Sequence, residues 1–226
     1  MVPSLAAAEP RNPWFSWDYV RNDRDFLVSM LEQHVRLTVE AVILALLVAV
    51  PLALVARRWR PLAGPIVAGA GVLYTIPSLG LFAMLAPFTG FTLERTVLVG
   101  LVVYALLVLL RNAIAGLQGV PSDVVEAARG MGYGGARLLW RIELPLALPV
   151  IMTGVRIATV STVALVTIGV INGNGGLGQV ILRGFQSDYR AQVLTGTVLC
   201  LILALVADLA LVLLTRALMP WTRRRA

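Results

Sequence analysis

The sequence predicts an all-α integral membrane protein with about five transmembrane helices, preceded by an N-terminal helix at the membrane interface. Hydrophobic residues make up 58% of the 226 residues and charged residues only 14%. That composition is too apolar for a soluble domain of this size. The apolar residues also come in long blocks, close to the ~20 residues that a helix needs to cross a bilayer. Clusters of arginine separate these blocks, as topogenic charge does in membrane proteins.

Residues 1–34 are expected to form an N-terminal tail and an interfacial helix. Residues 1–22 are rich in proline and aromatic side chains, and Trp and Tyr favour the level of the lipid headgroups. From residue 23 to 34, the apolar residues Phe26, Leu27, Met30 and Leu31 share one helical face. This pattern predicts an amphipathic helix that lies flat before the first span. A passive anchor is the expected role of this region, and a binding role is the alternative.

The transmembrane domain covers residues 35–219, and five spans are expected at 35–56, 62–88, 96–117, 149–171 and 191–219. An odd number of spans places the two ends of this chain on opposite sides of the membrane. With the N-terminus outside, the cytoplasmic segments hold ten arginines: Arg57, Arg58, Arg60, Arg129, Arg137, Arg141, Arg216, Arg223, Arg224 and Arg225. The loops on the other side hold only Arg95, Arg183 and Arg190. The positive-inside rule therefore predicts an external N-terminus and a basic cytoplasmic tail at 220–226.

The segment 118–148, between the third and fourth spans, is weakly hydrophobic and carries a distinctive motif. Glu126-Ala127-Ala128 predicts a short helix with an acid near its positive end. Gly132 allows a tight break, after which a second short helix is expected. Pro145 suits the first turn of the helix that follows, because its missing N–H costs nothing there.

This spacing resembles the EAA loop of ABC-importer permeases, a cytoplasmic segment that docks into a groove on a separate ATPase subunit. The residues that match, and to which the resemblance gives the coupling role, are Glu126, Ala127, Ala128, Gly130, Gly132, Leu144 and Pro145. Four further blocks of sequence also match the family, in the same order along the chain: 33–38, 75–79, 144–149 and 175–178. The chain therefore resembles permeases of the glycine betaine/carnitine/choline osmoprotectant group. It departs from their pattern at 171–174, where relatives usually have an apolar Ile-Gly-Ala run, and this leaves the solute open.

The resemblance implies a permease fold like that of methionine importers, in the plasma (inner) membrane of a bacterium. It also implies a second permease chain, two cytoplasmic ATPase subunits and an extracytoplasmic substrate-binding protein. The substrate would be a quaternary ammonium compound such as glycine betaine, choline or carnitine, and methionine or another amino acid is the alternative. A gradient-driven transporter and a structural membrane protein are the rival classes. A gradient-driven transporter would need acidic residues at the midplane or an internal repeat. A structural membrane protein would have no need of the coupling motif.

The chain is not expected to be an enzyme. It contains no lysine and no G-x-x-x-x-G-K-[ST] sequence, so ATP and Mg²⁺ would bind the partner ATPase. It has one cysteine, Cys200, and one histidine, His34, which provide neither a cysteine metal cage nor a metal-spaced histidine pair, and no cofactor is expected in this chain. The net charge of +7 lies in clusters between apolar blocks, which argues against nucleic acid as a partner.

Two groups of polar residues within the spans are candidates for the substrate path. Tyr74, Thr75, Pro77 and Ser78 lie at mid-depth of the second span, and Thr167 and Asn172 lie at the outer end of the fourth. Pro77 frees a carbonyl one turn earlier, which Thr75 or Ser78 is expected to satisfy. An aromatic ring beside a broken helix suits a quaternary ammonium ion through cation–π attraction. The alternative is that Pro77 only bends the helix for packing.

Residues 173–178 formally match the G-x-G-x-x-G dinucleotide fingerprint. That fingerprint requires a preceding strand, which a loop after a membrane span does not provide. Gly175, Gly176 and Gly178 are then either a flexible turn or an outer gate loop that lets backbone approach a partner. The family resemblance favours the gate.

Asp208 is a charge within the fifth span. This span has Gly196, Cys200, Ala204 and Asp208 at every fourth position. Together they form a face of small residues that lets helices approach closely. A charge inside a membrane usually faces the bundle and has a partner. Arg111 and Arg156 lie at a similar depth, so a buried structural ion pair is expected, with a proton relay as the alternative.

Overall fold

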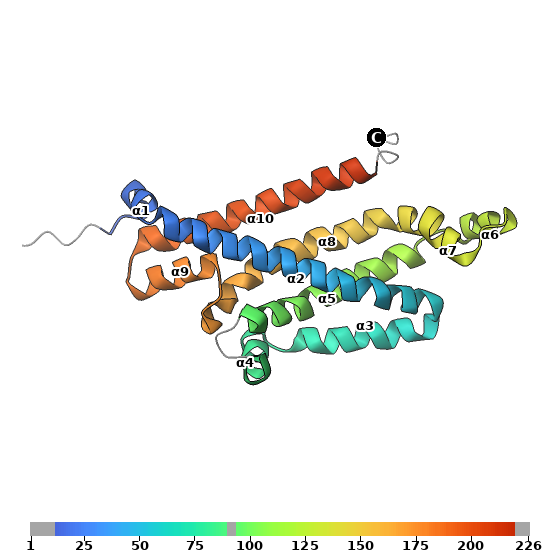
Figure 1. Cartoon of the computed structure of the whole chain (residues 1–226), viewed down its shortest axis with the longest axis horizontal. Helices are drawn as coiled ribbons and strands as arrows, with labels where there is room; N and C mark the ends of the chain where they lie inside the picture. The colour runs from blue at the N-terminus through green and yellow to red at the C-terminus, as the bar shows by residue number, and fades with distance from the viewer. Residues whose placement is uncertain (1–11, 90–93, 220–226) are drawn as a thin grey trace, which may run out of the picture.

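The computed structural model describes residues 12–89 and 94–219, which form an elongated bundle of helices (Figure 1). Within this part of the chain, four helical runs are long and apolar enough to cross a membrane: Arg24–Arg58, Glu94–Gln118, Gly135–Asn172 and Arg190–Leu218. The helices α3 (Arg60–Thr75) and α4 (Ser78–Thr89) pass the same test as a bent pair. The prediction of an all-α membrane protein with about five spans is confirmed.

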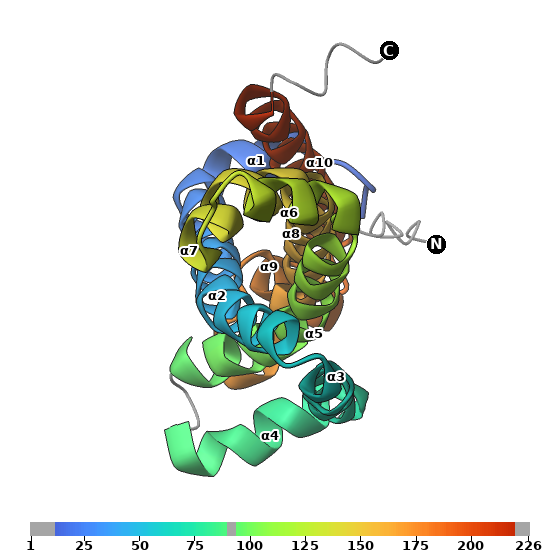
Figure 2. The same ribbon diagram turned by 90° about the vertical axis from the view of Figure 1, so that its right-hand side faces the viewer.

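The helix α5 (Glu94–Gln118) forms the centre of the bundle, between α2 (Arg24–Arg58) and α8 (Leu144–Val166) (Figure 2). Close packing comes from alanines at every fourth position of α2. Ala41, Ala45, Ala49 and Ala53 are each at most 1% exposed. Small side chains let helix backbones approach and gain dispersion energy, which is the main source of helix association in lipid. The helix α10 (Arg190–Leu218) lies on the rim and packs mainly against α8 and α9 (Leu177–Gln186).

The N-terminal boundary at residue 34 was wrongly predicted. The expected interfacial helix at 23–34 and the expected first span at 35–56 are one continuous helix, α2. Its first apolar face packs against protein: Leu27 is buried, and it lies in one cluster with Leu177 and Val180 of α9. Helical periodicity alone cannot distinguish a face that meets lipid from one that meets another helix.

The second span is broken, with an angle of 95° between α3 and α4. Ile76 has extended backbone angles and ends α3, and Pro77 follows it directly. The helix α4 then packs across the start of α5, where the Phe82 ring lies against Gly100. A Cβ atom at Gly100 would come within 2.3 Å of that ring. The bend is therefore held by tertiary packing as well as by the proline.

The remaining short helices gather at the two ends of the bundle. The helices α6 (Ser122–Gly130) and α7 (Gly135–Leu138) lie at one end, together with the π-helical turn η1 (Leu139–Glu143). At the other end lie α1 (Trp17–Asn22), α9 and the 3₁₀ turn η2 (Thr167–Asn172). We refer to these as the α6–α7 end and the α9 end. The first eleven residues of the expected tail and the basic tail at 220–226 lie outside the described residues.

Helix α1 is anchored to the bundle by Tyr19, which is buried. Its ring meets that of Tyr189 edge to face, with the ring centroids 5.4 Å apart. Burial, together with the nearby Asp23 carboxylate, raises the pKa of Tyr19 to about 12. The phenol therefore stays neutral at physiological pH and serves as a packing group.

Candidate functional site

The coupling segment, residues 118–148, has the predicted helix, turn and second helix. The helix α6 begins at Ser122, four residues before Glu126, so Asp123 rather than Glu126 supplies the acid in its first turn. A Schellman motif ends it: the Gly132 N–H donates to Arg129 O (2.9 Å), and the Tyr133 N–H donates to Ala128 O (3.1 Å). Gly132 has φ +83°, and a Cβ there would meet open space. Glycine is therefore required for its conformation.

The coupling segment turns apolar side chains outward. Met131 and Trp140 are each 70% exposed; Met131 directly precedes the turn at Gly132, and Trp140 lies in η1. Glu126 and Ala127 are also exposed, whereas Ala128 is buried and holds α6 to the bundle. Large exposed side chains beside polar ones are typical of a surface that binds another protein. Of these residues, the motif identified Glu126 and Ala127 but not Met131 and Trp140.

The second half of the segment runs directly into the membrane helix. Pro145 lies in the first turn of α8, as predicted, but α7, η1 and α8 continue into one another without a break. The Leu144 N–H bonds to Leu139 O across a wider π turn. A proline cannot bond to the carbonyl four residues earlier, and the extra residue in a π turn gives its ring room. No loop therefore separates α7 from α8.

A buried ion pair ties the coupling segment to α2. Glu143, the last residue of η1, is buried, and its carboxylate meets the guanidinium of Arg57 at the end of α2. A cavity of about 530 Å³ opens beside this pair, between α2 and α6. Its lining includes Arg58, Arg60 and Arg129. Sequence reasoning missed Glu143 as a site residue, although it directly precedes Leu144 and Pro145 of the motif.

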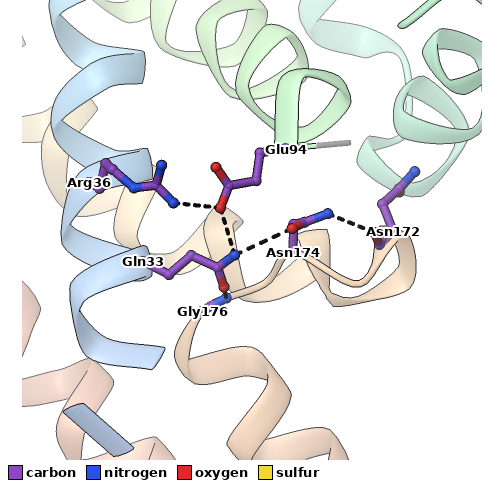
Figure 3. Close-up of polar contacts among 6 residues, drawn as sticks. All are labelled: Gln33, Arg36, Glu94, Asn172, Asn174 and Gly176. Carbon is purple, nitrogen blue, oxygen red and sulfur yellow. Dashed lines mark hydrogen bonds and ion pairs between the residues drawn. The ribbon is translucent and has the colours of Figure 1, made fainter. Parts of the chain in front are cut away.

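At the α9 end, a cluster of polar side chains joins three separate parts of the chain (Figure 3). We call it the Gln33 cluster: Gln33 and Arg36 of α2, Glu94 of α5, Asn172 at the end of η2, and Asn174 and Gly176 of the loop that follows. The Gln33 amide donates to Glu94 Oε1 (2.8 Å) and Asn174 Oδ1 (3.3 Å), and it accepts from the Gly176 N–H (3.1 Å). Arg36 also pairs with Glu94 at 2.6 Å.

His34 lies next to this cluster and is fully buried. Its Nδ1 accepts from the Leu177 N–H (3.2 Å), so its Nε2–H donates to Val163 O (2.9 Å). Both bonds require the neutral ring. The histidine thus ties α2 to α8 and to the first residue of α9, a structural role that the interfacial position in the sequence did not reveal.

Three glycines of the loop after η2 and the start of α9, Gly175, Gly176 and Gly178, are close-packed. A Cβ at Gly175 would lie 2.5 Å from Val170 N, and one at Gly178 would lie 2.4 Å from Thr167 O. Gly176 has φ +52°, and its Cβ would lie 2.7 Å from His34 Cβ. Contacts this short are excluded for real side chains, so the loop holds one tight conformation against α2 and η2.

We expect Gln33→Ala to loosen this loop and to lower the free energy of unfolding by about 1–3 kcal/mol, because three partly buried partners lose a hydrogen bond. Amide hydrogen exchange over 172–178 would rise in the purified protein. Glu32→Ala, at an exposed neighbour on the same helix, is the matched control and should change neither the free energy of unfolding nor the amide exchange. Equal exchange in the two variants would contradict a role for Gln33 in fixing the loop.

The predicted path residues of the second span lie at the helix break. Tyr74, Thr75 and Pro77 are exposed. The Tyr74 ring meets the Tyr104 ring of α5 edge to face (centroids 5.5 Å apart), and the Tyr104 hydroxyl donates to Ile76 O. The Leu73 carbonyl freed by Pro77 accepts from the Ile76 N–H (3.4 Å), whereas the Thr75 hydroxyl bonds to Val72 O. The expectation that Thr75 or Ser78 would satisfy the freed carbonyl was wrong.

The other two path residues lie near the α9 end. The Thr167 hydroxyl donates to Ala164 O within its own helix (2.7 Å). Asn172 is buried, and its carbonyl accepts from the Asn174 amide (2.9 Å) within the Gln33 cluster. Asn172 therefore helps to hold the loop after η2. Among the residues that the structure describes, no group of three His, Cys, Asp or Glu side chains could hold a metal ion.

The charge in the last span pairs with Arg156 and not with Arg111. Arg156 Nε and Nη2 donate to the two carboxylate oxygens of Asp208, each at 2.8 Å. Of the small face of α10, Gly196 packs against Val180 and Ile181 of α9, whereas Cys200, Ala204 and Asp208 are only partly buried. Contrary to the prediction, the pair is not buried, since the two side chains are 38% and 34% exposed. Depth along a helix can be estimated from sequence, but the direction in which a side chain points cannot.

The chain is similar to known membrane proteins over most of its length. Residues 41–224 match the family described as "Binding-protein-dependent transport system inner membrane component". The glycine betaine/carnitine/choline transport system permease protein OpuCD of Bacillus subtilis is 33% identical over 92% of this chain and 90% of its own. The carnitine transport permease protein OpuCB of Listeria monocytogenes is 37% identical over 86% of this chain and 88% of its own.

The fold has a close counterpart among solved structures. A chain of the MetNI methionine ABC transporter, in inward-facing form, superposes with a TM-score of 0.75. It covers 85% of this chain and 95% of its own length at 24% identity. This likeness confirms the predicted methionine-importer-like fold, and at that identity it concerns the fold alone.

Proposed function

Because this chain belongs to the family of binding-protein-dependent transport system inner membrane components, we propose that it is the permease subunit of an ATP-driven importer for quaternary-ammonium osmoprotectants. The observation that carries the proposal is its similarity, over 92% of its length, to a permease named for glycine betaine, carnitine and choline. The methionine transporter is a fold relative only, so methionine or another amino acid is the second candidate. A gradient-driven transporter is less well supported.

The α6–α7 end is the proposed docking surface for a cytoplasmic ATPase. Exposed Met131 and Trp140, next to Glu126, offer apolar and charged contacts to a partner groove. The continuous run from α7 through η1 to α8 and the Arg57–Glu143 pair would carry a displacement of this surface into the bundle. ATP and Mg²⁺ would bind the partner, and its closure would move two permease chains between inward- and outward-facing arrangements as rigid bodies.

The α9 end would then face outward, in agreement with the arginine distribution. The N-terminus lies outside and the C-terminus in the cytoplasm in this proposal. The rigid loop at 173–178, held by the Gln33 cluster, is the proposed outer gate and the surface on which an extracytoplasmic binding protein docks. A rigid loop suits docking because little conformational entropy is lost on binding.

The helix break supplies the proposed lining of the path. Tyr74 is exposed, and Tyr104 lies directly beside it. Aromatic faces attract quaternary ammonium ions, whose charge cannot form hydrogen bonds. Thr75, Pro77 and Ser78 complete this surface around the broken helix.

The proposal predicts that Gly132→Trp and Glu126→Lys uncouple the ATPase without preventing membrane insertion. The first variant strains a left-handed residue beside the docking surface, and the second reverses an exposed charge on it. In proteoliposomes with the ATPase and binding protein, we expect at least tenfold lower glycine betaine uptake, the effect of losing about 1.4 kcal/mol of coupling. Membrane yield should match that of wild type.

Glu32→Lys makes the same charge change on an exposed residue at the other end of the molecule and should transport normally. Normal uptake and normal ATPase stimulation by Glu126→Lys would show that the docking surface lies elsewhere. The same assay decides the solute. Uptake of methionine but not of glycine betaine, choline or carnitine would overturn the proposed substrate class.

A further inference from the structure

The Arg156–Asp208 pair lies in the membrane-spanning part of the chain, yet both side chains are partly exposed. We propose that this pair binds the two charged ends of a zwitterionic quaternary-ammonium solute as it crosses the membrane. Arg156 would hold the carboxylate of the solute, and Asp208 would hold its cationic head. This inference rests on the proposed function and assigns two residues that discriminate zwitterions from simple cations.

The position of the pair along its helices places it within the expected hydrocarbon core. Arg156 lies seven residues inside the expected fourth span at 149–171, and Asp208 lies ten residues before the end of α10 at Leu218. At a rise of about 1.5 Å per residue, these separations are about 10 and 15 Å. A hydrocarbon core is about 30 Å thick. Solute sites of transporters commonly lie at such depth.

The pair faces a cavity between α8 and α10. This cavity has a volume of about 330 Å³ and is lined by Thr153, Arg156, Ile157, Val160, Ser161 and Asp208. Charged side chains in membrane segments almost always face protein or a water-filled cavity. The volume falls within the range of about 300–1,000 Å³ that is typical of small-molecule sites.

Both charged groups keep binding capacity while they are paired. A guanidinium has five N–H donors, and Arg156 uses only Nε and Nη2 on Asp208. Each carboxylate oxygen of Asp208 accepts one of these bonds and retains a further lone pair. A zwitterion can therefore lie antiparallel to the pair, with its carboxylate on the free guanidinium donors and its cation against the Asp208 carboxylate.

A purely structural ion pair would not need this arrangement. Two helices are held together most effectively by a pair that water cannot reach, since solvent weakens the attraction. At 38% and 34% exposure, the pair is open on the cavity side. The alternating charges there match a molecule that carries both signs and no net charge.

The test compares two solutes with the same cationic head. Glycine betaine carries a trimethylammonium group and a carboxylate, whereas choline carries the same group and a hydroxyl. Uptake would be measured in proteoliposomes that contain the permease with its ATPase, at solute concentrations that saturate the binding protein. Under these conditions, the affinity of the binding protein does not set the ratio of the two rates.

We expect Arg156→Gln to lower the rate of betaine uptake relative to choline uptake by about 10- to 100-fold, the factor that one lost charged hydrogen bond represents. Arg156→Lys retains a cation and should keep most of the betaine-to-choline ratio. Asp208→Asn should slow both solutes by a similar factor. Arg111→Gln is the matched control, because this exposed arginine of α5 lies outside the pair and should leave the ratio unchanged.

A ratio that stays the same in Arg156→Gln would overturn this inference and leave the proposed function intact. If the single variants do not assemble, the double variant Arg156→Gln/Asp208→Asn removes both charges and avoids an unpaired one. It should assemble and lose uptake of both solutes, and wild-type uptake by that variant would also overturn the inference. A wild-type complex that carries neither betaine nor choline would overturn the proposed function and this inference together.

Discussion

Replacing Gly176 with alanine should prevent the α9 end of the bundle from closing, at a cost of at least about 3 kcal/mol in the free energy of unfolding. Two effects add. The residue has φ +52°, where a Cβ costs about 1–2 kcal/mol. The new Cβ would also lie 2.7 Å from His34 Cβ and 2.9 Å from His34 Cα. Since the second contact is with the backbone of α2, no side-chain rotation relieves it.

Gly173→Ala is a matched control in the same loop. Gly173 has φ +76°, but a Cβ there would meet nothing within 4 Å. This variant should show only the backbone cost of about 1–2 kcal/mol. The two variants would be compared by yield on size-exclusion chromatography and by thermal unfolding in detergent. Equal stability of the two would mean that the loop moves freely away from His34, which would contradict the close packing.

The spans and the coupling segment could be predicted from the sequence because their signals are local. A block of apolar residues marks a span whatever it packs against, and a helix end at Gly132 needs only the glycine and its neighbours. The continuous α2 was missed for the converse reason. The apolar face around Leu27 meets α9, which lies some 150 residues later in the chain, and periodicity does not report the partner.

The polar contacts between helices could not be predicted from the sequence. Gln33 bonds to Glu94 and Gly176, which are 61 and 143 residues away. Asp208 had two arginines at the right depth, and only the rotation of α8 about its own axis brings Arg156 to it. The 95° bend after α3 also depends on contacts between distant residues, because Pro77 predicts a break but the packing of α4 on α5 sets its angle.

The second large effect is expected at the joint between α2 and the coupling segment. Glu143→Ala leaves Arg57 without its partner, and Arg57→Ala leaves a buried carboxylate uncompensated. Removing one member of a buried ion pair costs about 3–5 kcal/mol. We expect either variant to lower the yield of the complex with the ATPase and to cut uptake per ATP hydrolysed at least tenfold. Arg58→Ala, next along the helix and exposed, should behave as wild type.

The double variant Arg57→Met/Glu143→Leu separates the two contributions of this pair. Apolar residues of similar volume often replace a buried pair without loss of stability, because no charge has to be desolvated. The double variant should therefore recover the complex yield that each single variant loses. It should recover uptake as well if packing between α2 and η1 is what transmits the movement of α7. Single variants that match Arg58→Ala would show that the coupling segment moves independently of α2, and α5 and α8, the two helices it joins, would then be its routes into the bundle.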